Sequence, residues 1–336
     1  MIRAYAANKP GAPLELFEYD PGALRPDEVE IDVMACGICH SDLSMLDNEW
    51  GMTAYPFVPG HEITGKVAAV GEAVTRVGVG DVVGLGWFAG SCMACEQCMS
   101  GNHNLCAANE GTIVGRHGGF ADKVRCRESW AIPLPKDLDV KKAGPLFCGG
   151  ITVFNPVAEF DVKPTDRVGV IGIGGLGHFA LQFLNKWGCE VTAFTSTGAK
   201  ADEARRMGAH KVVNSRDAAE LDAVAGTYDF ILSTVNVELE WDKYLNALKP
   251  KGKLHTVGAV LTPMPIPAFG LIGGQKSVSG SPLGSPATTA KMLEFCARHD
   301  IEAVTEHFPL SKVNEAIAHL REGKARYRIV LENDLG

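Results

Sequence analysis

The stretch Gly172-Ile173-Gly174-Gly175-Leu176-Gly177 decides the fold of this chain. It matches the pattern G-x-G-x-x-G and lies between an apolar run at 167–173, which predicts a strand, and an amphipathic run at 175–187, which predicts a helix. Glycines in this arrangement permit a tight turn and let backbone N–H groups approach a pyrophosphate at the helix N-terminus. A glycine pattern alone also occurs in structural turns, but between a strand and a helix it predicts a dinucleotide-binding site.

The sequence beyond this loop continues the alternation of strands and helices. Such a rhythm is typical of a parallel, doubly wound sheet with helices on both faces. After about residue 284 the chain adds a helix at 287–298, a loop, a helix at 312–322 and a strand at 327–331. Between the glycines and residue 284 the expected strands are 190–195, 211–214, 228–235 and 253–257, and the expected helices are 200–207 and 240–248.

Residues 1 to about 147 predict a different, β-rich region. Polar and apolar residues alternate at 28–33, as in half-buried strands, and further strands are expected at 65–70 and 81–84. Glycines and prolines separate these runs at short intervals, which indicates a barrel or sandwich, and no helix of convincing length is expected before residue 140.

Composition excludes several classes of protein. The 336 residues carry a formal charge of −8, which argues against a nucleic-acid or membrane-surface partner, since both need basic patches. An uncharged run at 168–185 imitates a membrane span, but its five glycines, His178 and Gln182 fit a buried strand, turn and helix better. The N-terminus has no apolar signal-peptide core, so we expect a cytoplasmic protein whose ten cysteines favour metal binding over disulfides.

The end of the second strand after the glycine loop indicates which dinucleotide binds. An NAD site places Asp or Glu about 20 residues beyond the glycines, where it accepts from the ribose 2′-OH. Here Thr195-Ser196-Thr197 lies at that point, with Lys200 close behind. Hydroxyls and a lysine can bind a 2′-phosphate, so the stretch favours NADP(H), with an ordinary polar loop as the alternative.

Four cysteines within fifteen residues predict a closed metal site. Cys92, Cys95, Cys98 and Cys106 can surround one Zn²⁺ tetrahedrally and leave no open position, which is typical of a structural site. An iron–sulfur cluster is the alternative. A nucleic-acid-binding zinc ribbon is disfavoured because no basic patch surrounds the cysteines.

A second set of metal-ligand residue types remains outside that lobe: Cys39, His61, Glu62 and Cys148. Two cysteines and a histidine with water or substrate in the fourth position form a known catalytic zinc arrangement. Sequence spacing alone does not bring them together. Cys36 and Cys39 also form a C-x-x-C pair, which leaves a redox pair or half of a zinc knuckle as alternatives.

Together these motifs resemble the zinc-dependent medium-chain alcohol dehydrogenases, and most of all their NADP(H)-using cinnamyl alcohol dehydrogenase-like branch. The resemblance covers essentially the whole chain. It implies a GroES-like catalytic domain from residues 1–148 and 284–336, with a structural-zinc lobe at about 88–108, and a Rossmann NADP-binding domain at 149–283. It also implies that Cys39, His61 and Cys148 bind the catalytic zinc of two zinc ions per subunit.

The resemblance further implies roles for the neighbouring side chains. Glu62 resembles a carboxylate that can exchange onto the zinc, Asp42 one that orients His61, and Ser41 the first group of a proton relay. The relay usually continues to a histidine three residues later, where this chain has Ser44. His40 is expected to face the cofactor pyrophosphate and Thr152 the nicotinamide, and the substrate pocket is expected to contain Trp50, Trp87 and Phe88, whose alternative is a role as core aromatics.

The resemblance implies reversible hydride transfer between NADP(H) and a primary alcohol or aldehyde, with reduction of aromatic or medium-size aliphatic aldehydes preferred. A polyol or sugar dehydrogenase, a non-catalytic zinc- and NADP-binding sensor and a thioredoxin-like oxidoreductase are the alternatives. The expected partner is a small-molecule substrate, and the expected assembly is a homodimer or homotetramer.

Overall fold

A computed structural model describes residues 1–196 and 200–335 of the chain. The chain divides into two compact units: residues 1–151 with 283–336 form unit 1, and residues 152–282 form unit 2. The polypeptide passes from the first to the second inside helix α3 (Gly149–Glu159). Among the described residues, no helix combines the length and the apolar character needed to cross a membrane.

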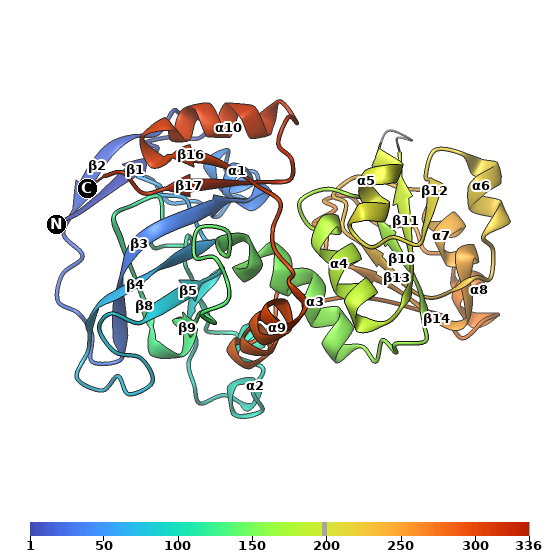
Figure 1. Cartoon of the computed structure of the whole chain (residues 1–336), viewed down its shortest axis with the longest axis horizontal. Helices are drawn as coiled ribbons and strands as arrows, with labels where there is room; N and C mark the ends of the chain where they lie inside the picture. Colours follow the sequence, from blue (N-terminus) through green and yellow to red (C-terminus); the bar gives the residue numbers. More distant parts are fainter. Residues whose placement is uncertain (197–199, 336) are drawn as a thin grey trace. The chain divides into compact units, whose positions relative to one another are not determined.

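Unit 1 is built on a seven-stranded sheet in which strands from both ends of the chain pair with each other (Figure 1). Its strands are β3 (Glu28–Ile38), β4 (Ile63–Val70), β5 (Val82–Leu85), β8 (Lys123–Arg127), β9 (Ile132–Pro133), β16 (Thr305–Pro309) and β17 (Arg328–Glu332), in the order β16-β17-β3-β4-β5-β9 with β8 on β3. β17 runs antiparallel to β3, and β3 antiparallel to β4. The C-terminal strand therefore lies directly beside the strand that precedes Cys39.

Two small sheets and several short helices complete unit 1. The small sheets pair β1 (Ile2–Ala6) with β2 (Glu15–Tyr19), and β6 (Phe88–Gly90) with β7 (Glu110–Gly111). Alternating buried positions along β1 and β3 contribute to one apolar core that extends through the unit. The helices are α1 (His40–Leu46), α2 (Glu96–Met99), α9 (Pro286–His299) and α10 (Val313–Arg321), with short 3₁₀ turns η1 (His103–Leu105), η2 (Glu128–Trp130), η3 (Gly144–Phe147) and η5 (Leu310–Lys312).

Unit 2 contains a six-stranded sheet in which every neighbouring pair of strands is parallel, in the order β12-β11-β10-β13-β14-β15. The order reverses between β10 and β13, as expected for a doubly wound fold. Its strands are β10 (Arg167–Ile171), β11 (Glu190–Thr195), β12 (Lys211–Asn214), β13 (Tyr228–Ser233), β14 (Leu248–Thr256) and β15 (Ser277–Gly280), and its helices after α3 are α4 (Gly177–Trp187), α5 (Ala201–Arg206), α6 (Ala218–Ala223), α7 (Trp241–Ala247) and α8 (Ala268–Ile272).

The predicted fold class, a β-rich domain joined to a doubly wound parallel sheet, is confirmed. The sequence predicted some elements with wrong bounds and missed others. The expected loop between the last two helices contains β16, a short strand at the edge of the sheet. The expected helix at 175 begins at Gly177, because the preceding glycines form the turn. β14 begins five residues earlier than expected and accommodates Pro250 where its register against β13 shifts.

Candidate active site

The strand register of unit 1 brings three separate segments to one end of the sheet. Ile329 of β17 pairs with Ile38 of β3, so Arg328 and Cys39, one step beyond that pair, are neighbours. Gly37 of β3 donates its N–H to the carbonyl of Glu62, which precedes β4 (2.8 Å). The same end of the sheet therefore contains Cys39, the adjacent pair His61 and Glu62, and Arg328 from the far end of the chain.

Three metal-ligand side chains converge there. The sulfurs of Cys39 and Cys148 are 3.9 Å apart, and His61 Nε2 is 3.3 Å from the Cys148 sulfur. Tetrahedral zinc with bonds of about 2.3 Å to sulfur and about 2.05 Å to nitrogen separates two sulfurs by about 3.8 Å and a sulfur from a nitrogen by about 3.6 Å. The observed distances fit one zinc ion. The Glu62 carboxylate belongs to the same group, whose donor atoms all lie within 4.8 Å of one another.

Asp42 holds this arrangement from behind. Its carboxylate accepts hydrogen bonds from the backbone N–H of Cys39 and of Gly60, and from His61 Nδ1, each at 2.9 Å. Burial lowers the pKa of His61, but the charge and hydrogen bond of Asp42 raise it, and the net direction is upward. The hydrogen bond to the Asp42 carboxylate places a proton on Nδ1, so Nε2, which faces the Cys148 sulfur, is the nitrogen that can bind a metal. Asp42 lies where the resemblance placed it.

Glu62 is paired with a partner that the sequence did not suggest. Both Glu62 and Arg328 are almost fully buried, and the Arg328 guanidinium donates to Glu62 Oε1. Burial raises the pKa of Glu62 to about 7, although Arg328 lowers it. The second oxygen, Oε2, has no hydrogen-bond partner among the described residues, and a Cβ on Gly37 would come within 2.1 Å of it. This oxygen is available to a metal ion. In the sequence, the one sign of this ion-pair partner was an arginine inside the apolar run 327–331.

The pKa values of the two thiols of the site are shifted in opposite directions. The hydrogen bond from Cys148 holds the pKa of Cys39 well below its ordinary value, whereas the same hydrogen bond together with burial raises that of Cys148. Cys39 is thus the thiol of the pair that loses its proton more readily. Cys36 does not join them: it is buried in β3, its sulfur lies 3.6 Å from the Gly37 carbonyl, and burial raises its pKa. The C-x-x-C spacing does not make a redox pair.

The four cysteines of the lobe form the second group. Their donor atoms lie within 4.8 Å of one another, and the sulfurs of Cys92 and Cys98 are 3.9 Å apart, which again fits one tetrahedral ion. Backbone N–H groups of Cys95 and Cys92 point at the sulfurs of Cys92 and Cys106 (3.3 and 3.4 Å) and stabilise negative charge there. Four protein donors leave no position for a substrate, so this group suits a structural ion.

A cavity of about 590 Å³ in unit 1 is lined by Met52, Trp87 and Val114 and by polar residues such as Arg25, Glu110 and Arg116. We call it the Trp87 cavity, because Trp87 lines it and also packs edge-on against the His61 ring, with ring centroids 4.9 Å apart. Trp50 packs against Trp87 at 5.9 Å. Phe88 instead lies in the core against Trp130, with centroids 5.4 Å apart. Among the three predicted pocket aromatics, Trp87 contacts the imidazole, Trp50 packs on Trp87, and Phe88 lies in the core.

The remaining predicted residues lie on helices α1 and α3. Ser41 and His40 form the first turn of α1; Ser41 is half-buried and His40 is exposed. Ser44, one turn later, is buried. Thr152 lies in α3, within unit 2, and is half-buried.

Unit 2 has a cavity of about 550 Å³ over the glycine loop. Gly172 adopts φ +87°, and a Cβ on Gly177 would come within 1.9 Å of the Gly172 carbonyl, so glycine is required at both positions. Sequence reasoning missed Ser215 and Arg216, which follow β12 on the neighbouring edge of this cavity. Thr197 lies outside the described residues. Predicted residues that line the cavity are Gly172, Gly174, Gly175, Leu176, Thr195, Ser196 and Lys200.

Comparisons with known proteins agree with this geometry. Residues 25–136 match the family model described as alcohol dehydrogenase GroES-like domain, and residues 175–298 match the one described as zinc-binding dehydrogenase. The chain is 56% identical to aldehyde reductase AdhA of Synechocystis, over 99% of both chains. The chain belongs to the zinc-type medium-chain alcohol dehydrogenases. The resemblance predicted from the motifs is thereby confirmed.

Solved structures of other alcohol dehydrogenases support the same assignment. A cinnamyl alcohol dehydrogenase from Sorghum bicolor superposes with a TM-score of 0.94 at 37% identity, covering 98% of this chain and 97% of the other. A cinnamyl alcohol dehydrogenase from Helicobacter pylori, complexed with NADP(H), gives a TM-score of 0.91 at 30% identity with the same coverage. For this alcohol dehydrogenase, the prediction of one closed and one open zinc site agrees with its two donor groups.

Proposed function

We propose that this alcohol dehydrogenase reduces aldehydes with NADPH and catalyses the reverse oxidation of primary alcohols with NADP⁺. The observation that carries the proposal is the convergence of Cys39, His61 and Cys148, whose donor atoms fit one zinc ion with a fourth position for a substrate oxygen. The Trp87 cavity lies on the other side of Trp87, which lines it and also packs against the His61 ring. The relative AdhA, named as an aldehyde reductase, supports the direction.

Cys39, His61 and Cys148 would hold the zinc, and a zinc ion at this position supplies a Lewis acid that polarises a carbonyl oxygen. Asp42 fixes the orientation of His61 through Nδ1. Ser41, half-buried at the start of α1, is the group that we assign to proton transfer with the substrate oxygen. Ser44 cannot store a proton at neutral pH as an imidazole can, so we assign the next step of the relay to water or the cofactor ribose.

The cavity of unit 2 would hold the dinucleotide. The glycine loop and the N-terminus of α4 would hold its pyrophosphate, since backbone N–H groups and the helix dipole there favour negative charge. At the other end, the hydroxyls of Thr195 and Ser196 lie near Lys200 and Arg216 in the same cavity. Two cations and two hydroxyls suit a 2′-phosphate, and the ribose-binding carboxylate of an NAD site is not found at the end of β11. NADP(H) is therefore the proposed cofactor.

The walls of the Trp87 cavity suggest the substrate class. Trp87, Met52 and Val114 give it apolar surface beside the polar side chains of Arg25, Asn109, Glu110 and Arg116, and its volume of about 590 Å³ accommodates an aromatic ring or a medium-length aliphatic chain. Aromatic and medium-size aliphatic aldehydes are the proposed substrates.

We propose further that the enzyme is a homodimer or homotetramer in the reducing environment of the cytoplasm. β15 is the edge of the sheet of unit 2, and an uncovered edge can pair with the same edge of a second copy. Nearby α8 exposes Phe269 and Ile272, 88% and 69% accessible, which a partner surface would cover. None of the ten cysteines forms a disulfide, as expected in a reducing compartment.

The test measures loss of NADPH absorbance at 340 nm with aromatic aldehydes, aliphatic aldehydes and sugars, repeated with NADH. We expect aldehydes and NADPH to give the highest kcat/KM. Cys39→Ala should abolish turnover in a folded protein, whereas Cys36→Ala, a matched change of the neighbouring buried thiol, should leave it largely intact. A folded Cys39→Ala enzyme with substantial turnover would refute the zinc assignment, and a preference for sugars would refute the substrate class.

A further inference from the structure

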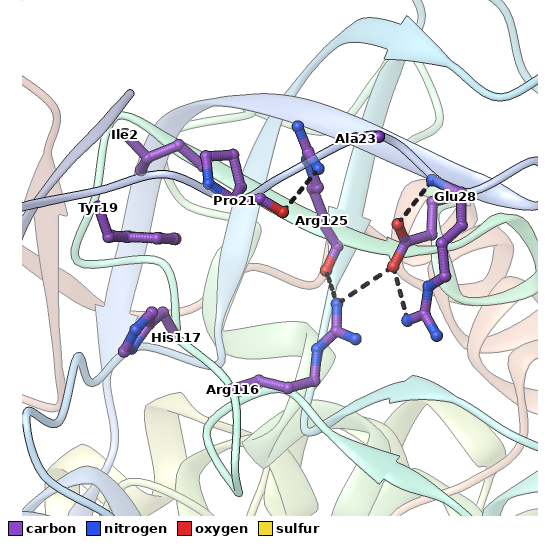
Figure 2. Close-up of a pocket in the computed structure, with 9 residues that line it drawn as sticks. Ile2, Tyr19, Pro21, Ala23, Glu28, Arg116, His117 and Arg125 are labelled. Atoms are coloured by element: carbon purple, nitrogen blue, oxygen red, sulfur yellow. Dashed lines mark hydrogen bonds and ion pairs between the residues drawn. The ribbon is translucent and has the colours of Figure 1, made fainter.

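The cavity over the glycine loop of unit 2 contains a cation without a partner. Arg216 is exposed and lines this cavity, and its guanidinium forms neither an ion pair nor a hydrogen bond with any described residue. Figure 2 shows the contrasting case, a cavity of unit 1 beside Tyr19, where Arg116 lies 3.8 Å from Glu28. All the arginines that line that cavity are paired with carboxylates. The cavity of unit 2 therefore offers a free positive charge that the one in Figure 2 lacks.

The carboxylates that could neutralise Arg216 are engaged elsewhere. Asp217 caps helix α6 and accepts from two backbone N–H groups of its first turn (2.9 and 3.3 Å). The carboxylate of Glu220 accepts from the backbone N–H of Asn214 (2.7 Å). Glu238 also lines the cavity, but it follows β13, and three strand spacings, about 14 Å, separate β13 from β12. In the part of the chain that the structure describes, no carboxylate therefore pairs with Arg216.

Strand pairing brings Arg216 beside the end of β11. Thr195 pairs with Asn214 in the parallel register of β11 and β12, and the Ser215 N–H donates to the Thr195 carbonyl (3.0 Å). Arg216 is the next residue, and it lines the same cavity as Thr195 and Ser196. In a doubly wound dinucleotide fold, the 2′ position of the adenosine ribose lies at the end of this second strand. Arg216 is therefore on the β12 side of that position.

Lys200, the second cation of this cavity, is held on the opposite side. Its Nζ donates to the backbone carbonyl of Ile173 in the glycine loop (3.2 Å). That loop follows β10, and β11 lies between β10 and β12 in the sheet. Since the pyrophosphate of a dinucleotide binds at the glycine loop, the charge of Lys200 acts on the pyrophosphate as well as on a 2′-phosphate. The charge of Arg216 acts mainly on the 2′-phosphate.

We propose that Arg216 is the residue that discriminates NADP(H) from NAD(H), because it binds the 2′-phosphate, and that Lys200 positions the glycine loop. This inference rests on the proposed cofactor. A planar guanidinium can donate two parallel hydrogen bonds to a phosphate, whereas an ammonium group acts as a point charge. The hydroxyls of Thr195 and Ser196 add hydrogen-bond donors to the same cavity but no charge.

Two nucleotides that differ only in the 2′-phosphate isolate its contribution to binding. The probes are adenosine 2′,5′-bisphosphate and 5′-AMP, each titrated into the zinc-loaded enzyme by isothermal calorimetry, so that no turnover is needed. The quantity compared is the Kd for 5′-AMP divided by the Kd for the bisphosphate. For the wild type we expect a ratio on the order of 100, since hydrogen bonds to a charged group contribute about 1.5–3 kcal/mol each.

Variants assign the ratio to a residue. Arg216→Gln should lower it by roughly tenfold or more, and should leave the Kd for 5′-AMP within about twofold of the wild type, which also shows that the variant is folded. Arg216→Lys keeps the charge and should lower the ratio less than Arg216→Gln. Lys200→Gln should weaken both nucleotides and change the ratio by less than about threefold. Arg206→Gln, the matched control, removes an exposed arginine of the same unit that does not line the cavity, and should leave the ratio unchanged.

The outcomes separate this inference from the cofactor assignment. A wild-type ratio near one would refute the binding of NADP(H), and the role of Arg216 with it. The role of Arg216 alone is overturned if the wild-type ratio is high and Arg216→Gln retains it. It is also overturned if Lys200→Gln lowers the ratio more than Arg216→Gln does, or if Arg206→Gln lowers it equally.

Discussion

The buried pair of Glu62 and Arg328 allows a quantitative prediction. Arg328 is 5% exposed and Glu62 is fully buried, and neither has another charged side chain within ion-pair distance among the described residues. Changing Arg328 to Met keeps much of the side-chain volume but removes the charge. Glu62 is then left with an uncompensated carboxylate in the interior, close to the Cys39 thiolate, which raises its pKa.

Breaking a buried ion pair by removing one partner costs about 3–5 kcal/mol in the free energy of unfolding. For a unit of roughly 200 residues, each kcal/mol lowers the Tm by about 2–4 °C, so Arg328→Met should lower the Tm of unit 1 by about 10 °C. Combining it with Glu62→Gln removes the orphaned charge as well. The double variant should therefore recover more than half of the loss, which gives a favourable coupling between the two sites of about 2 kcal/mol or more.

The assay is urea unfolding of the zinc-loaded enzyme, followed by tryptophan fluorescence, for the wild type, both single variants and the double variant. Arg321→Met is the matched control: Arg321 makes a two-pronged ion pair with Asp47 at 2.7 Å, but it lies at the surface. We expect that control to cost about 1 kcal/mol or less. If Arg328→Met is no more destabilising than Arg321→Met, or if the double variant is as unstable as the sum of the single variants, the reasoning is wrong.

Three further predictions concern the metal, the cofactor and pH. Asp42→Asn weakens the alignment of His61, so zinc content after dialysis against a chelator should fall and metal affinity should drop by roughly 10–100-fold; unchanged affinity would count against the role of Asp42. Thr195→Asp places a carboxylate where we expect the 2′-phosphate, so the ratio of kcat/KM for NADPH over NADH should fall by roughly 100-fold, and an unchanged ratio would refute that placement. Burial lowers the pKa of His255 to about 4, so the unfolded state binds a proton more readily than the folded state does. The contribution of neutral His255 to the free energy of unfolding is therefore fully present above about pH 6.5. It is lost as the pH falls towards 4, by at most about 3 kcal/mol. Urea unfolding at several pH values should show a flatter profile for His255→Gln, and an equal slope in both proteins would contradict the prediction.

The sequence predicted the parts of the fold that depend on local patterns. The glycine loop, the alternation of strands and helices after it, and the spacing of Cys92 to Cys106 all lie within short windows, where geometry follows from residue type and distance along the chain. Short edge elements such as β16 were missed because a five-residue strand carries little pattern of its own. Its pairing with β17 determines that it is a strand.

The active site could be predicted only in part, because its members come from distant segments. Cys39 and His61 were suggested by residue type, and their meeting with Cys148 was expected only from the family resemblance. The signal for Arg328, a charged residue inside the apolar run 327–331, does not indicate that residues 62 and 328 are in contact. The antiparallel register of β17 on β3 creates that contact. Arg216 was missed for the same reason, because the edge of the sheet brings it to the strand that ends at Thr195.

Charge balance explains why the C-terminal strand has to supply an arginine to this site. Two thiolates and the Glu62 carboxylate together carry three negative charges in a buried space, and a zinc ion supplies two positive charges. Arg328 supplies the third. The remaining carboxylate, Asp42, is stabilised by three hydrogen bonds from N–H groups rather than by a cation. A charge left unpaired in such surroundings is costly, so the metal and Arg328 must both be present for the donors to remain ionised together. The two ends of the chain are therefore joined at the catalytic site by electrostatic necessity as well as by strand pairing.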